Sequence, residues 1–459
     1  MAEAAAAQAA AADPQQQGSL RVGGGGGGGS RRDKRGQPNL RVPWAALSYV
    51  TCELNYGGRI TDENDRRLCK VLLSDLYRPE VLLADRNYAF SPSGSYKPPL
   101  RGSTVKQTRL HIQEYPLIDA PEIFGLHDNA DISCAAKQAT ELFDAACLLQ
   151  PRAAGARHDE VDEIVGRVID DLEERIPLPF DIAAARQAFP YAYLECNNTV
   201  LVQELSRYNA LTTYVRSSVG ELRDAFAGRV AMTEELEGIA AAIHSNRLPE
   251  EWGRRSYASR KPLAAWVSDL IQRLTFFDNW LTRGQPGGYP GQVGEFWLPA
   301  FFQPQCFLTA VLQNHARRNG LPIDGIRFEH QVLSKVAKRR ELPMSGAHIY
   351  GLYLEGASWN SKDRTLTEPL PKQLYAEMNV IWLKPTQEPP MPASGVDGAN
   401  YYDCPVYKTT GRAAAKLQTG SDPHSGANFV CHVRLPSAAG AGEAHWIKRS
   451  AALICSLDD

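Results

Sequence analysis

The residue types that most often carry chemistry occur in this sequence, but not at spacings that build a known site. Nine cysteines lie far apart with no C-x-x-C pair, and the ten histidines show no metal-ligand spacing. This distribution argues against a structural zinc site or a disulfide framework and predicts reduced, mostly buried thiols. Carboxylate pairs at 170–171 and 173–174 fall on the solvent face of a predicted helix, which favours ion pairing over acid–base catalysis.

Motifs for phosphate binding and for nucleophilic catalysis are also missing. The dipeptide Gly-Lys does not occur, so G-x-x-x-x-G-K-[ST] cannot be built, and no predicted strand precedes the glycine tract at 23–29. The nearest approach to G-x-S-x-G, at 356–360, ends in Asn360. We therefore predict no catalytic, cofactor-binding or metal-binding residues and no enzyme activity; an enzyme with an unrecognised site around 346–359 remains an alternative.

Charge and hydropathy exclude further classes of protein. The 459 residues include 50 Lys and Arg against 52 Asp and Glu, so a broad nucleic-acid-binding surface is not expected. No apolar run has the roughly 18–20 residues that a membrane span needs, and no secretory signal opens the sequence. The length suits two to four domains.

Helical patterns dominate the first two thirds of the sequence. Residues 1–36 are Ala-, Gln- and Gly-rich and are expected to be disordered and dispensable. Apolar residues then repeat at helical spacing, with Thr61 as the expected cap of the second helix. The predicted helices cover residues 42–54, 61–76, 132–149, 161–176, 198–226, 233–243, 262–281 and 304–313.

Strand patterns replace helical ones in the last third of the sequence. A stretch with five glycines and two prolines, at 284–294, reads as a hinge. Short β-branched or aromatic runs follow at 348–354, 379–383, 402–407, 428–433 and 452–455. We therefore predict an α+β protein, in which a helical lid and a helix bundle precede a small antiparallel β-barrel. The aromatic run at 296–307, which includes Trp297, Phe301 and Phe307, is expected to be the seam between the two parts.

Several collinear segments resemble the C-terminal end of dynein heavy chains. They are V-P-W-A-A-L-S-Y at 42–49, N-Y-G-G-R-I-T-D at 55–62, D-R-R at 65–67, F-G-L-H-D-N-A-D-I at 124–132, N-T-V-L-V-Q-E at 198–204, F-W-L at 296–298, P-Q-C-F-L-T at 304–309, G-L-Y-L-E-G-A-S-W at 351–359 and Y-D-C-P-V-Y-K-T at 402–409. The resemblance covers residues 40–459 and is closer to axonemal than to cytoplasmic heavy chains. It implies four regions: a tail at 1–36, the helical lid of the sixth AAA+ module at 37–122, and a C-terminal domain with a helical part at 123–290 and a helix plus β-barrel at 291–459.

The same resemblance implies a function. Dynein heavy chains are minus-end-directed microtubule motors, whose ATP and Mg sites and microtubule-binding stalk lie upstream of this segment, so the protein is expected to be a fragment that braces and regulates the AAA+ ring. Expected partners are the upstream AAA+ modules, dynein intermediate and light chains through the complex, and microtubules indirectly, in the cytoplasm and cytoskeleton of a ciliary or flagellar axoneme. A stand-alone interaction or scaffold module without a motor is the other alternative.

The matching motifs also yield local expectations. Trp44, Tyr56 and Leu68 are expected to pack in a helical hairpin that Gly57 and Gly58 close at positive φ. Asp62 and Asp65 are expected to pair with Arg66 and Arg67, or to contact a neighbouring module. The segment 402–405 is expected to enter a strand, because Pro405 is unsuited to a central ladder position.

Overall fold

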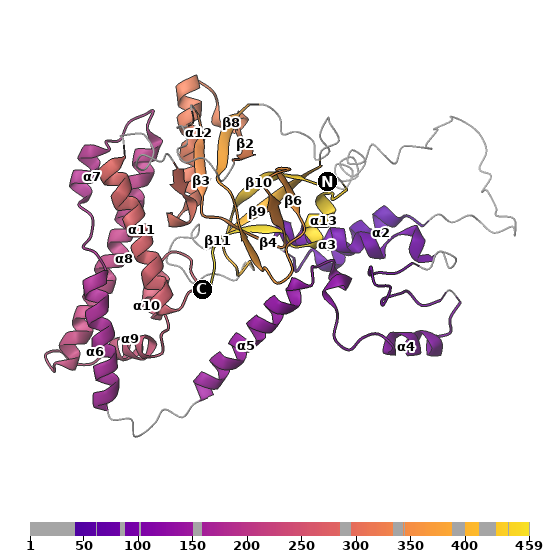
Figure 1. Ribbon diagram of the computed structural model, residues 1–459, viewed down its shortest axis with the longest axis horizontal. Helices are drawn as coiled ribbons and strands as arrows, with labels where there is room; N and C mark the ends of the chain where they lie inside the picture. Colours follow the sequence, from indigo (N-terminus) through magenta and orange to yellow (C-terminus); the bar gives the residue numbers. More distant parts are fainter. Residues whose placement is uncertain are drawn as a thin grey trace. The chain divides into compact units, whose positions relative to one another are not determined.

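The computed structural model describes residues 42–60, 62–82, 88–100, 102–149, 158–284, 295–333, 343, 345–387, 400–412, 428–438 and 440–458. The protein divides into two compact units, 1–47 and 48–459. In the first unit, residues 42–47 are described and contain the start of helix α2 (Trp44–Val50). The second unit contains all the other elements (Figure 1). The predicted tail at 1–36 and most of the predicted hinge at 284–294 lie outside the described residues.

Short helices form the region predicted to be a lid. They are the end of α2, a π-helical turn η2 (Thr51–Tyr56), α3 (Glu63–Leu76), η3 (Pro79–Leu82), α4 (Val105–Gln113) and η5 (Pro121–Phe124). The cap of α3 is Asp62, whose carboxylate accepts hydrogen bonds from the N–H groups of Asn64 and Asp65 at 2.8 and 3.2 Å. The predicted cap, Thr61, lies outside the described residues.

The turn after η2 differs from the prediction. Gly57 has φ −59°, in the right-handed helical region, and Gly58 is not among the glycines with positive φ. Tyr56 is 51% exposed, and Leu68 packs against the main hydrophobic core, so these two side chains do not form the predicted cluster. A Cβ at Gly57 would lie 2.3 Å from the carbonyl oxygen of Glu53, which gives this glycine a steric reason instead of a conformational one.

Helices of 6 to 31 residues make up the middle of the sequence. They are α5 (Asn129–Leu149), α6 (His158–Arg175), α7 (Ile182–Ala188), α8 (Cys196–Phe226), α9 (Glu234–His244), α10 (Glu250–Arg255), α11 (Leu263–Arg283) and α12 (Pro304–Asn319). Helix α8 contacts α6, α7, α9, α10, α11 and α12, and therefore forms the centre of the helical part (Figure 1). Among the described helices, none is both long and apolar enough to span a bilayer.

The strands form two sheets. The first has the order β1-β3-β8-β2, with β1 (Glu295–Trp297), β2 (Arg327–Val332), β3 (Ala347–Tyr350) and β8 (Ile381–Thr386). The second has the order β5-β6-β10-β9-β11-β4-β7. Its strands are β4 (Tyr353–Glu355), β5 (Ser358–Asn360), β6 (Thr365–Thr367), β7 (Tyr375–Glu377), β9 (Asn400–Thr409), β10 (Phe429–Ser437) and β11 (Ala452–Ser456). The helical turns η6 (Leu298–Ala300) and η7 (Ile323–Gly325) and helix α13 (Glu443–Lys448) complete the region.

The α+β class is confirmed, but the described strands do not form a closed antiparallel barrel. Both sheets have free end strands, and the pairs β1–β3, β10–β6 and β11–β9 are parallel. The strand predicted at 348–354 divides into β3 and β4 of different sheets, because Gly351 turns the backbone at φ +87°.

The prediction for Pro405 is wrong. Strand β9 is central, between β10 and β11, and Pro405 faces His432 of β10 within it. Proline removes only one donor from a ladder, and the other nine residues of β9 keep theirs. The strand therefore tolerates one lost donor in its interior.

Candidate functional site: a buried seam and an exposed lid contact

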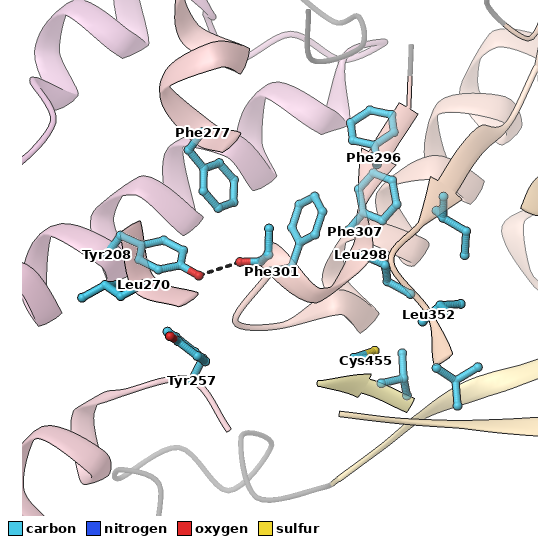
Figure 2. Packing of buried hydrophobic residues seen from close by; sticks show 14 of the residues in the cluster. Tyr208, Tyr257, Leu270, Phe277, Phe296, Leu298, Phe301, Phe307, Leu352 and Cys455 are labelled. Carbon is cyan, nitrogen blue, oxygen red and sulfur yellow. Dashed lines mark hydrogen bonds between the residues drawn. The ribbon is translucent and has the colours of Figure 1, made fainter. Parts of the chain in front are cut away.

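A continuous hydrophobic core joins the helical part to the sheets through residues 296–302, which we call the seam. Phe296, Leu298, Phe301 and Phe307 are at most 3% exposed, and Trp297 is half-buried. The ring of Phe301 lies 4.6 Å from Phe307 and 5.8 Å from Phe277 of α11, centroid to centroid (Figure 2). The prediction that this aromatic run is buried between the two parts is confirmed.

A buried ion pair holds the seam on its helical side. The guanidinium of Arg273 donates from Nε to Asp269 at 2.6 Å and from Nη1 to the carbonyl oxygen of Pro299, and it lies 3.7 Å from the ring centroid of Tyr257. The side chain of Arg273 is only 3% exposed. The pair is therefore desolvated, and its remaining polar contacts are to the seam backbone and an aromatic face.

Two residues of α8 fix the same backbone. The hydroxyl of Tyr208 donates to the carbonyl oxygen of Ala300 at 2.6 Å, drawn as a dashed line in Figure 2. Glu204 is fully buried; its carboxylate accepts from the N–H of Phe302 at 2.7 Å and from Arg207 at 2.6 Å. Burial raises the pKa of Glu204 and of Tyr208. Polar anchors thus hold the C-terminal end of η6, where a short turn leaves backbone groups without partners in the turn itself.

The sheet side of the seam depends on Gly351. At φ +87° it adopts the left-handed conformation, and a Cβ there would lie 2.4 Å from the indole of Trp297. The seam also borders a cavity of about 10 Å³ that Lys408 of β9 and Cys455 of β11 line. That space has room for about one water molecule.

A second contact, which we call the lid contact, joins α3 to the sheets and to α13. Arg67 donates to the carbonyl oxygen of Asp403 at 3.2 Å, lies 3.5 Å from the carboxylate of Glu443, and has its guanidinium 5.5 Å from the ring centroid of Tyr402. Lys448 pairs with Asp75. Oδ1 of Asn64 lies 3.0 Å from Nε2 of His432, within hydrogen-bond distance.

Partners of the acidic and basic residues in the matched D-R-R segment differ from the expectation. Asp62 caps α3, and Arg66 lies 3.7 Å from Glu53 and donates to the carbonyl oxygen of Ile60. Arg67 instead reaches residues more than three hundred positions away. Spacing within one helix could not reveal this partner, because the contact depends on how α3 packs.

The junction between η5 and α5 is held by one arginine and one asparagine. Arg449 donates to the carbonyl oxygens of Gly125 and Leu126 at 2.9 and 2.8 Å and to Glu368 at 3.0 Å. The side chain of Asn129 bonds three backbone groups of the loop before β7, those of Leu370, Lys372 and Gln373. Gly125, at φ +74°, leaves room for the side chain of Lys448.

Among the described residues, no group of three or more His, Cys, Asp and Glu side chains could hold a metal ion. Asp170 and Glu173 pair with Arg223, and Asp171 pairs with Arg175, on the surface of α6. The segment around 346–359 contributes β3, β4 and β5 to two sheets, and its glycines serve turns and close approach.

Side chains of α3 and α13 thus join a group of short helices to an α+β domain. The family model for the C-terminal domain of dynein heavy chains matches residues 136–455, and the model for the AAA lid domain of dynein heavy chains matches residues 33–130. The protein therefore belongs to the dynein heavy chain family.

Curated relatives agree with this assignment. "Dynein axonemal heavy chain 1" of Rattus norvegicus is 41% identical over 418 residues, which are 91% of this protein and 9% of the relative. "Dynein axonemal heavy chain 3" of Mus musculus is 39% identical over 418 residues, 91% of this protein and 10% of the relative. "Dynein axonemal heavy chain 12" of Rattus norvegicus is 38% identical over 419 residues, 91% of this protein and 13% of the relative. The sequence thus spans only about a tenth of the length of these relatives.

Proposed function

We propose that this protein serves as the C-terminal region of an axonemal dynein heavy chain, in a minus-end-directed microtubule motor that drives ciliary or flagellar movement. In this proposal the ATP and Mg sites and the microtubule-binding stalk belong to upstream AAA+ modules, and intermediate and light chains join through the complex. Residues 37–122 act as the lid of the sixth AAA+ module, and residues 123–290 and 291–459 act as the two parts of the C-terminal domain. The segment itself braces and regulates the ring and turns over no ATP.

The observation that carries this proposal is that the protein has both a buried seam and a lid contact made of partly exposed ion pairs. Arg67 and Lys448 are 24% and 23% exposed, and their ion pairs join α3 to α13 beside the apolar contacts that Leu68 and Val71 make with the core. Such a joint can change partners when the ring changes conformation, whereas the seam keeps the C-terminal domain in one piece. A regulatory brace needs both properties.

The experiment uses a heavy chain in which this segment follows the AAA+ motor modules. Arg67→Glu combined with Lys448→Glu reverses both cations of the lid contact. We expect the velocity of microtubule gliding and the basal ATPase rate to change at least twofold. The segment alone should hydrolyse no ATP in the same assay.

The matched control is Arg167→Glu, a charge reversal at an exposed pair on α6, where Arg167 and Glu163 are 71% and 67% exposed. It should leave both rates unchanged. Equal rates in the wild type and the lid variant, or ATP turnover by the segment alone, would count against the proposal.

A further inference from the structure

A groove of about 660 Å³ runs between α8 and α12, lined by residues that take no part in the seam or the lid contact apart from Gln303. The two helices are antiparallel there: the N–H of Cys196 donates to Asn314 at 2.7 Å, and Arg207 donates to Gln303 at 3.1 Å. The walls come from Cys196, Thr199 and Gln203 of α8 and from Cys306, Thr309 and Gln313 of α12. These positions repeat at three- and four-residue intervals, so each wall is one face of a helix.

The groove has the dimensions and the surface that a third helix needs. From position 306 to position 317, α12 rises by about 16 Å, or three helical turns. Thr199 and Ala310 are small, which permits close approach of another backbone, and the amides of Gln203 and Gln313 offer both donors and acceptors. Arg317 is the one charged residue among those that line the groove. A partner face buried here must therefore be uncharged along most of its length, because an unpaired buried charge is costly.

The end of the groove at Arg317 carries the side chains that usually anchor protein interfaces. Tyr193 is 71% exposed and Tyr191 is 58% exposed, and Leu194 beside them is 43% exposed. The guanidinium of Arg317 lies 4.6 Å from the ring centroid of Tyr193. Tyrosine and arginine are enriched at the energetic centres of interfaces, and here they lie next to an open groove.

Arg317 has capacity for an anionic partner. Nη1 donates to the carbonyl oxygen of Tyr193 at 2.8 Å and to Sγ of Cys196 at 3.1 Å, and within the described residues these are its hydrogen bonds. A guanidinium has five N–H donors, so Nε and Nη2 can receive a carboxylate. The neighbouring Arg318 is already paired with Glu195 at 3.1 Å.

We propose that the α8–α12 groove binds a helix of another polypeptide, with small and uncharged polar side chains along its buried face and a carboxylate that pairs with Arg317. The exposed tyrosines cover the end of that helix. The proposal is independent of the proposed motor function, since it depends on this surface alone.

The test uses the full protein and its own thiol at Cys306, in the groove wall. The probe is a helical peptide of alanine and glutamine that contains one cysteine, activated as a mixed disulfide. One glutamate lies eleven residues before this cysteine, and a second lies eleven residues after it. The control peptide has lysine in place of both glutamates. Tethering raises the effective concentration of the peptide at the groove, so an unoptimised sequence suffices. Capture at Cys306 is measured by peptide-mapping mass spectrometry over a series of 2-mercaptoethanol concentrations.

We expect the glutamate peptide to withstand at least tenfold more reductant than the lysine peptide. Arg317→Gln should abolish that preference, Thr309→Arg should block capture of both peptides, and Cys306→Ser should remove the labelled site. Cystamine, a small disulfide, should label Cys306 in the wild type and in the Arg317→Gln variant, which shows that the groove is open and the variant folded.

Three results would overturn the proposal. They are equal capture of the two peptides, a glutamate preference that survives Arg317→Gln, and failure of cystamine to reach Cys306. If cystamine labelling falls as the protein concentration rises, a second copy fills the groove, and the proposed partner is also wrong.

Discussion

The seam and the lid contact both join segments that are distant in sequence, but they do so with different physics. In the seam, Arg273 is 3% exposed and Asp269 is 10% exposed, inside a shell of aromatic rings. In the lid contact, Arg67 and Glu443 are 24% and 38% exposed. Breaking a buried ion pair strands a charge in a medium of low dielectric constant, whereas water replaces a partner at an exposed pair. The buried pair of the seam is thus expected to cost more to break than the partly exposed pairs of the lid contact.

The largest effect should come from breaking the buried pair of the seam. Arg273→Met leaves Asp269 without its cation, and we expect a loss of about 3–5 kcal/mol in the free energy of unfolding. Urea denaturation followed by circular dichroism measures it. Adding Asp269→Leu should restore part of the loss, because the stranded carboxylate is removed. A single variant within about 1 kcal/mol of the wild type would show that the pair does not hold the seam.

The next largest effect should come from Gly351 on the sheet side of the seam. Gly351→Ala places a Cβ against the indole of Trp297 at a left-handed φ, and we expect a loss of about 2–3 kcal/mol. The control is Gly58→Ala, where no atom lies within 4 Å of the added Cβ and φ is not positive. Thermal unfolding should separate the two variants by several degrees. Equal melting temperatures would mean that Trp297 moves aside freely.

Acid should weaken the contact between the two sheets. Nδ1 of His330, on β2, accepts a hydrogen bond from the N–H of Arg434, on β10, at 3.2 Å. Burial lowers the pKa of His330 to about 4, while Asp403 opposes and Arg434 reinforces this shift. The folded protein therefore binds this proton less readily than the unfolded polypeptide does. The stabilisation of the folded protein by neutral His330 is therefore complete above pH 6.5 and is lost as the pH falls towards 4.

The measurement for His330 is urea unfolding at pH 7, 5.5 and 4. The contribution of this one residue should be about 2 kcal/mol over that range. His330→Gln, which cannot gain the proton, should show a correspondingly smaller loss between pH 7 and pH 4. Parallel pH profiles for the two proteins would exclude His330 as the source.

The smallest effect on stability should come from the lid contact. Arg67→Ala removes a cation that is 24% exposed, and we expect a loss below about 1 kcal/mol in the free energy of unfolding. Arg167→Ala on α6 serves as the exposed reference pair. A loss from Arg67→Ala as large as that from Arg273→Met would erase the distinction between the two joints.

The sequence predicts the long amphipathic helices better than the joints between them. Helix α8 was expected at 198–226 and occupies Cys196–Phe226, because an apolar face persists over many turns. Helices α4, α7 and α10 were missed, since six to nine residues carry too little periodicity. The seam was predicted because a dense aromatic run must be buried. Its ion pair was not, since Asp269 and Arg273 read as an ordinary surface pair at helical spacing.

The partners in the lid contact, too, could not be predicted from the sequence. The D-R-R segment marked Arg66 and Arg67 as important, but their partners lie on elements that only tertiary packing brings near. The barrel prediction failed for a related reason, because strand patterns do not specify which edges pair. Gly351 was placed inside a predicted strand and a matched motif, and both its turn and its close approach to Trp297 require coordinates.

Native-state hydrogen exchange tests the distinction between the joints most directly. In the wild-type protein, increasing but sub-denaturing urea should leave α11 amides, from Leu270 to Phe277, exchanging only through global unfolding. The amides of α3 should exchange through a local opening whose free energy is at least about 2 kcal/mol lower and depends little on urea. Equal opening free energies and equal urea dependence in α3 and α11 would contradict the account, because the lid contact would then be as permanent as the seam.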